Sequence, residues 1–123
     1  MGGEGPAAGI IPKNKKESNV IRNAFTMKLK PGKAAEYKRR HDALWPELAE
    51  ALREAGISDY AIFLDEASGI LFAVQKLADA HTSENLPEQA IMKKWWAYMK
   101  DIMASNPDNS PVSIPLQEVF YMP

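Results

Sequence analysis

The sequence contains no cysteine among its 123 residues. This absence excludes disulfides, thiolate nucleophiles and sulfur-ligated metals together, so any catalysis must use histidine, a carboxylate, tyrosine or lysine. The two histidines, His41 and His81, lie far apart without the close His-His spacing of metal sites, and no metal centre is expected. His81 lies in a polar stretch, where we expect it to be solvated.

An excess of charge of either sign is also missing. The 15 basic and 16 acidic side chains leave a net charge of -1, which offers no positive field for the phosphates of a nucleic acid. No window approaches the roughly 20 apolar residues of a membrane span, and the N-terminus lacks the apolar segment of a signal peptide. We therefore expect a cytoplasmic protein that binds neither nucleic acid nor membranes.

The N-terminal segment has few apolar residues, and burial therefore offers little to offset the entropy of ordering it. We expect residues 1–19 to form a flexible leader. The chain of 123 residues lies within the usual size of a single domain, so residues 20–123 are predicted to form one.

Two periodicities divide residues 20–123 into strands and helices. Residues 20–30 alternate between apolar and polar side chains, which predicts a half-buried strand. Apolar and aromatic residues recur at helical spacing over residues 37–52 and predict a helix. Within it Pro46 either produces a kink or begins a second helix, and Gly56 is a natural terminator.

The second half of the chain repeats this order. Residues 60–64 and 70–77 read as an antiparallel hairpin, because turn-forming residues separate two runs of strand formers. Residues 92–103 predict a second long helix. Prolines and small polar residues predict a loop over residues 106–115, and residues 116–121 predict a closing strand.

The resulting order of elements is that of the ferredoxin-like βαββαβ fold, an α+β arrangement of four antiparallel strands with both helices on one face. The other face of the sheet would carry apolar side chains that no element of the chain covers. A second copy stacked sheet against sheet would bury them, so we expect a symmetric homodimer.

His41 is the side chain best suited to moving protons near neutral pH. Tyr37 and Trp45 lie four residues to either side of it, so all three would project from one face of a helix. Such a platform suits a pyranose, which offers an apolar face for stacking and hydroxyls for hydrogen bonds. The same spacing is typical of an amphipathic helix packed on a sheet, and the pattern alone leaves both interpretations open.

Further aromatic residues are candidates for the same site. Trp95 and Trp96 are adjacent on the predicted helix and point about 100° apart, so one would fill the core while the other reaches a pocket. Tyr60 lies at the start of a strand. There its hydroxyl would lie at the edge of a cavity, or the residue would be an ordinary strand former with no role in a site.

Several motifs, in one order along the chain, resemble those of L-rhamnose mutarotases. The segments Tyr37–His41 and Leu44–Leu48 are similar to the YxxRHxxxWPEL signature of that family. The leader and residues 79–89 depart from the family pattern. Similar blocks continue the match within residues 21–123 at Asp59–Ile62, Lys94–Met99, Asn106–Pro111 and Leu116–Tyr121.

The resemblance implies a homodimeric α/β barrel of ferredoxin-like subunits that interconverts the α and β anomers of L-rhamnose without cofactor or metal. His41 would be the catalytic proton donor. Tyr37, Tyr60, Trp95 and Trp96 match positions that contact the sugar.

Anomer exchange requires removing the proton from the anomeric hydroxyl and delivering a proton to the ring oxygen. The ring then opens, the C1 aldehyde rotates, and closure occurs on the other face. The partner base stays open among Asp108, a water molecule and a tyrosine hydroxyl. Two alternative functions are another dimeric-barrel enzyme, such as a cofactor-free monooxygenase, and a non-enzymatic small-molecule binding module.

Overall fold

Four strands form one antiparallel sheet in the computed structural model of this chain, which describes residues 20–123. The predicted leader, residues 1–19, lies outside the described residues. The strands follow the order β2-β3-β1-β4 across the sheet, which is the order of a ferredoxin-like fold. Their bounds are β1 Ile21–Lys28, β2 Ile57–Asp65, β3 Ile70–Leu77 and β4 Ser113–Pro115.

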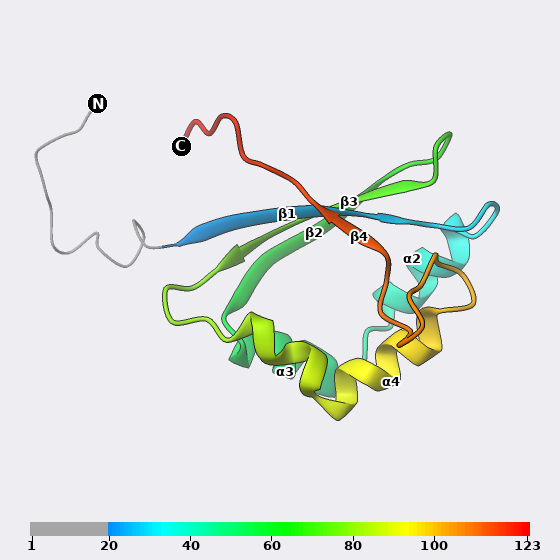
Figure 1. Cartoon of the computed structure of the whole chain (residues 1–123), viewed down its shortest axis with the longest axis horizontal. Coiled ribbons are helices and arrows are strands. Elements are labelled where there is room, and N and C mark those ends of the chain that lie inside the picture. Colours follow the sequence, from blue (N-terminus) through cyan, green and yellow to red (C-terminus); the bar gives the residue numbers. More distant parts are fainter. Residues whose placement is uncertain (1–19) are drawn as a thin grey trace, which may run out of the picture.

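Three α-helices lie on one side of this sheet, as the α+β prediction required (Figure 1). The predicted first helix is two helices, because Pro46 is the first residue of the second one. Proline fits there since its missing N–H has no partner in the first turn and its φ is already helical. No helix within residues 20–123 is long and apolar enough to cross a membrane. The helices are α2 Ala34–Asp42, α3 Pro46–Glu54 and α4 Ala90–Met99, with a 3₁₀ helix η2 at Ser83–Glu88.

The last strand lies earlier in the chain than predicted. β4 is Ser113–Pro115, inside the segment predicted as a loop, and the prediction of a strand over residues 116–121 was wrong. The last backbone bond to β1 runs from the Leu116 N–H to the Ala24 carbonyl, and the chain then leaves the sheet. The apolar residues that produced the strand pattern are exposed there, with Phe120 at 77%.

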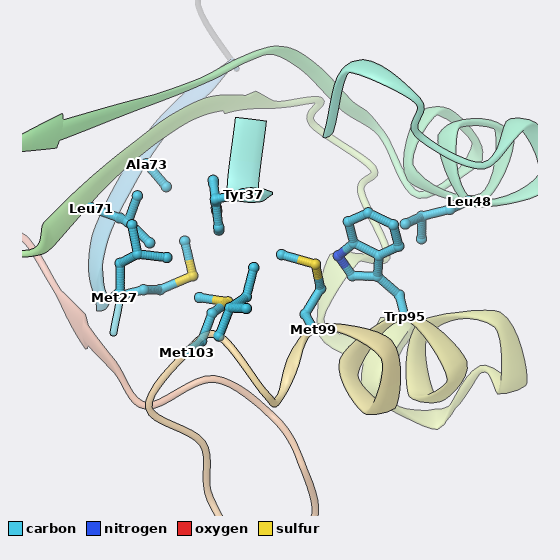
Figure 2. Packing of buried hydrophobic residues seen from close by; sticks show 10 residues of the cluster. Met27, Tyr37, Leu48, Leu71, Ala73, Trp95, Met99 and Met103 are labelled. Atoms are coloured by element: carbon cyan, nitrogen blue, oxygen red, sulfur yellow. The ribbon is translucent and has the colours of Figure 1, made fainter. Parts of the chain in front are cut away.

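The hydrophobic core lies between the helices and the sheet (Figure 2). Leu48 of α3 and Leu71 of β3 leave only 2% and 1% of their surface exposed. The helix α4 ends at Met99, earlier than predicted, but Ile102 and Met103 beyond its end are still part of the core. Burial along β3 alternates strictly, so one face of the sheet meets the helices and the other does not.

A β-bulge in β2 changes which side chains face the helices. The pairing with β3 shifts register between Ser58 and Ala61, so β2 carries one extra residue there. Asp59, within the bulge, has a φ of 47°. Because the extra residue reverses the alternation, Tyr60 lies on the same face as Ile62, which packs against the core.

The outer face of the sheet, away from the helices, carries uncovered apolar side chains. Phe63 of β2 and Phe72 of β3 lie opposite each other and leave 63% and 39% of their surface exposed. Ile114 of β4 leaves 62% exposed. No helix within residues 20–123 lies over this face, as the ferredoxin-like prediction implied.

The segment of residues 79–89 packs against the end of α3. His81 is partly buried rather than solvated, so the prediction for it was wrong: its Nδ1 lies 2.9 Å from the Ser83 hydroxyl. Its backbone approaches Gly56, which follows α3 with a φ of 91° and is the predicted terminator. A Cβ at Gly56 would lie 2.9 Å from the His81 Cβ. Glycine is required there by both the backbone conformation and the close approach.

Replacing Gly56 by alanine will lower the free energy of unfolding more than replacing Gly32 by alanine. Both glycines have a positive φ, 91° and 75°, so both variants carry the same kind of backbone strain, of about 1 to 3 kcal/mol. Only at Gly56 does the new methyl group collide with another segment, since nothing lies within 4 Å of a Cβ at Gly32. Urea unfolding measures the difference. Equal losses would show that the segment around His81 moves away freely.

Candidate active site

His41 lies in the last turn of α2 and is surrounded by aromatic rings. Tyr37 stacks on its imidazole with the ring centroids 4.2 Å apart, and Trp95 of α4 meets the imidazole edge to face at 5.3 Å. Trp45 joins this group through Trp95, at 5.1 Å, because the break before Pro46 separates it from α2. The predicted grouping of Tyr37 and His41 on one helix face is confirmed, whereas the prediction that Trp45 shares that helix was wrong.

A hydrogen bond fixes the orientation of the His41 imidazole. Its Nδ1 lies 3.1 Å from the carbonyl oxygen of Tyr37, one helical turn earlier. A carbonyl only accepts hydrogen bonds, so Nδ1 carries the proton and the lone pair of the neutral ring is on Nε2.

Burial also lowers the pKa of His41 from its usual 6.5, against the opposite influences of the Tyr37 carbonyl and Asp42. The imidazole is therefore neutral at neutral pH. With Nδ1 occupied, Nε2 is the nitrogen that is able to accept a proton from a bound molecule.

Tyr37 of α2 and Tyr60 of β2 are close enough for Tyr60 to influence the pKa of Tyr37. Burial raises the pKa of Tyr60 to about 12, and burial together with the proximity of Tyr60 raises the pKa of Tyr37. Tyr60 as a whole leaves 39% of its surface exposed, but its pKa reflects the phenol oxygen, which the bulge in β2 turns toward the helices. Both hydroxyls are protonated at neutral pH and available as hydrogen-bond donors and acceptors.

The adjacent tryptophans differ in burial, as their divergent directions on α4 predicted. Trp95 leaves 8% of its surface exposed and is part of the core, where it lies beside Met99 and Leu48 (Figure 2). Trp96 is only partly buried. Which ring contacts a ligand stays a prediction. The buried ring is the one that contacts His41, so the core and the candidate site share this residue.

Tyr98 belongs to the same aromatic group, although it was not among the predicted site residues. Its ring centroid lies 5.4 Å from that of Trp45 and 5.6 Å from that of Trp95. The signal available in the sequence was its spacing, since Tyr98 follows Trp95 by three residues and therefore lies on the same side of the helix.

Asp108, one candidate for the partner base, uses its carboxylate within its own loop. It accepts hydrogen bonds from the backbone N–H of Ser110, at 3.0 Å, and from the Ser110 hydroxyl. These bonds lower the pKa of Asp108 below its usual value. Because Asp108 already accepts these hydrogen bonds, its carboxylate is less suited to accept a substrate proton than a base whose lone pair is free. Within residues 20–123 no three histidine or carboxylate side chains are arranged to hold a metal ion.

The fold is shared with a distant structure of different description. A putative antibiotic biosynthesis monooxygenase from Caulobacter crescentus superposes with a TM-score of 0.52 at 23% identity, covering 89% of this chain and 98% of that one. At this identity the likeness shows the fold alone.

Much closer similarity connects the chain to one family of sugar isomerases. The model of the L-rhamnose mutarotase family matches residues 22–122. The L-rhamnose mutarotase of Brucella anthropi is 58% identical over 102 residues, which cover 83% of this chain and 96% of that protein. The crystal structure of an L-rhamnose mutarotase from Formosa agariphila superposes with a TM-score of 0.79 at 54% identity, covering 84% of this chain and 99% of that one. The match extends over nearly all the described residues and includes the helix that carries His41, and on this ground the chain belongs to the L-rhamnose mutarotase family.

Proposed function

We propose that this chain interconverts the α and β anomers of L-rhamnose, with His41 as the proton carrier. The observation that carries the proposal is the neutral imidazole of His41, held through Nδ1 and bordered by aromatic rings, with Nε2 left to act on a ligand. Family membership supplies the substrate. The monooxygenase alternative has only the common fold in its favour, and a binding module would not need an oriented base.

The reaction breaks and re-forms the bond between C1 and the ring oxygen, and it moves protons between the two oxygens bonded to C1. In our mechanism Nε2 of His41 takes the proton of the anomeric hydroxyl and returns a proton to the ring oxygen. Both oxygens are attached to C1, so one nitrogen near that carbon serves both. Ring opening leaves an aldehyde that rotates about the C1–C2 bond before closure. His41 thus begins as a base, and the proton-donor role implied by the family resemblance is the second half of the same cycle.

The aromatic residues around His41 would bind the sugar. We propose that Trp95 and Trp96 offer stacking surface to its C–H face and that the hydroxyls of Tyr37 and Tyr60 bond its hydroxyl groups. Trp95, being buried, would contribute mainly by holding His41, while the more exposed Trp96 would carry more of the sugar contact. The neutral state of both tyrosines suits hydroxyl partners, which donate as well as accept.

The variant His41→Ala is expected to fold but to lose anomer exchange by about 10² to 10⁴-fold, the contribution of one acid-base group. Saturation-transfer NMR between the two anomers of L-rhamnose measures the exchange rate with and without protein. The matched control is His81→Ala, which removes the other histidine, located beside Gly56 after the end of α3. Near-normal exchange by a folded His41→Ala variant would remove His41 from the mechanism.

The exchange rate is expected to fall as the pH drops through the pKa of His41. Burial places this pKa below the usual 6.5, so the neutral base persists into mildly acidic solution and the rate reaches a plateau at neutral pH. The NMR exchange rate, measured from about pH 5 to pH 8, gives the profile. A rate that increases as the solution becomes more acidic would contradict a neutral imidazole as the starting base.

We also propose that two copies pair through the outer face of the sheet. The exposed phenyl rings of Phe63 and Phe72 form an apolar surface there. A hollow of about 380 Å³ lies between the sheet and the first residues after β4, and Val74 and Leu116 are among its lining residues. Packing two such faces against each other would remove both surfaces from water.

Light scattering of the unaltered chain is expected to report the mass of a dimer at micromolar concentration. The variant Phe63→Glu should shift it toward the monomer, because pairing would bury two carboxylates against apolar surface. Glu50→Lys, a charge change on the exposed side of α3, should leave the dimer intact. A monodisperse monomer for the unaltered chain would refute the pairing.

Three further proposals concern the domain organisation of the protein, its metabolic role and its location in the cell. We propose that residues 20–123 act as one domain, in support of which the family model spans residues 22–122. We further propose that the protein works in rhamnose metabolism in the cytoplasm. Growth on L-rhamnose tests the role in rhamnose metabolism, and cell fractionation tests the location in the cytoplasm.

A further inference from the structure

Arg40, next to His41 at the end of α2, is a nearly buried cation whose side chain leaves 10% of its surface exposed. Its guanidinium makes hydrogen bonds in several directions. Nε donates to the Glu36 carboxylate at 2.6 Å, while Nη1 and Nη2 donate to the two oxygens of Asp101 at 2.9 and 3.1 Å. Nη1 also donates to the backbone carbonyl of Tyr98 at 2.7 Å. These bonds connect α2 to the end of α4.

Few other contacts fasten the last turn of α2. The helix has no side-chain cap at its N-terminus, and its backbone lacks the close approach to other elements that α3 makes to α4 and β2. Tyr37 anchors the middle of the helix in the core. Arg40 therefore adds its hydrogen bonds to the contact of His41 with Trp95, which also joins the end of α2 to α4.

Arg40 is also connected to the His41 imidazole by a chain of three contacts that involve aromatic rings. The guanidinium lies over the ring of Tyr98, 4.5 Å from its centroid. Tyr98 packs against Trp95, and Trp95 meets His41 edge to face. Because Arg40 and His41 are also neighbours in the chain, this path forms a closed loop. A shift of α2 at Arg40 would change how Trp95 meets the imidazole.

Two carboxylates balance the charge of the Arg40 guanidinium. A buried cation is tolerated when carboxylates pair with it and satisfy its donors. Arg40 lowers the pKa of Asp101, and Arg39 together with Arg40 lowers the pKa of Glu36 to about 2, so both carboxylates are ionised at neutral pH. The two-pronged bond to Asp101 needs the planar fork of arginine, which lysine does not provide.

We propose that Arg40 is a positioning residue for the sugar isomerisation, which ties α2 to Asp101 and Tyr98 and so holds the His41 imidazole against Trp95. It acts through His41 and does not touch the sugar. The inference rests on the proposed function of His41.

The test compares Arg40→Met and Arg40→Lys with a control on the same helix. Both variants are expected to lower kcat roughly 10- to 100-fold with a smaller change in KM, since a misplaced base affects the reaction more than binding. The midpoint of the fall in rate at acidic pH, called the acid limb, should move to higher pH, toward 6.5. A released imidazole becomes hydrated, and burial then no longer lowers its pKa. Lys38→Met removes an exposed ion pair with Asp42 that makes no contact with α4, and it should leave kcat unchanged.

Asp101→Asn extends the test to the partner of Arg40. It should reproduce part of the loss, and the double variant with Arg40→Met should lose little more than Arg40→Met alone, as expected for two residues of one network. Asp101→Asn and Arg40→Lys also keep the test decisive if Arg40→Met fails to fold.

Unchanged kcat and an unmoved acid limb in folded variants would overturn the positioning role, even if their melting temperatures fall. The control for the underlying proposal is His41→Ala. Full activity of that variant would refute the proposed function, whereas an inactive His41→Ala beside fully active Arg40 variants would refute only the inference about Arg40.

Discussion

The hydrogen bond between the His41 imidazole and the Tyr37 carbonyl sets what the site is able to do. It occupies Nδ1, and because the ring is also partly buried and neutral, Nε2 is left as an acceptor of protons. The bond closes within one turn of α2, so the helix itself orients the ring. Stacking by Tyr37 and edge contact with Trp95 then restrict its movement. A positioned, neutral imidazole of this kind is suited to general acid-base catalysis.

The two faces of the sheet have separate roles in this arrangement. The inner face packs against the helices and supports the aromatic group around His41. The outer face exposes Phe63 and Phe72 and is available for a second copy. Since the site lies between sheet and helices, pairing through the outer face would not obstruct it. The fold by itself does not specify the chemistry, because function depends on the side chains that the fold carries.

Precision in the site depends on contacts between elements that are far apart in the sequence. The break before Pro46 separates α2 from α3, so α2 is short and needs anchors beyond its own backbone. Tyr37 provides one in the core, and Arg40 provides another through Asp101 and the Tyr98 carbonyl. The end of α2, which carries His41, is thus joined to the end of α4, and α4 also carries Trp95.

Local patterns in the sequence determined most of the helices and strands and the pairing of Tyr37 with His41 at the candidate site. Period-two and helical spacing identified the fold, and the four-residue interval from Tyr37 to His41 brought the two rings together, because neighbours on one helix need no tertiary contact to meet. Tertiary structure decided the rest. Tyr60 faces the helices only because a bulge adds one residue to β2, and the final strand lies at Ser113–Pro115 because pairing with β1 ends there. The bond of Arg40 to Asp101 likewise joins residues whose proximity depends on how the helices pack, which spacing along the chain does not encode.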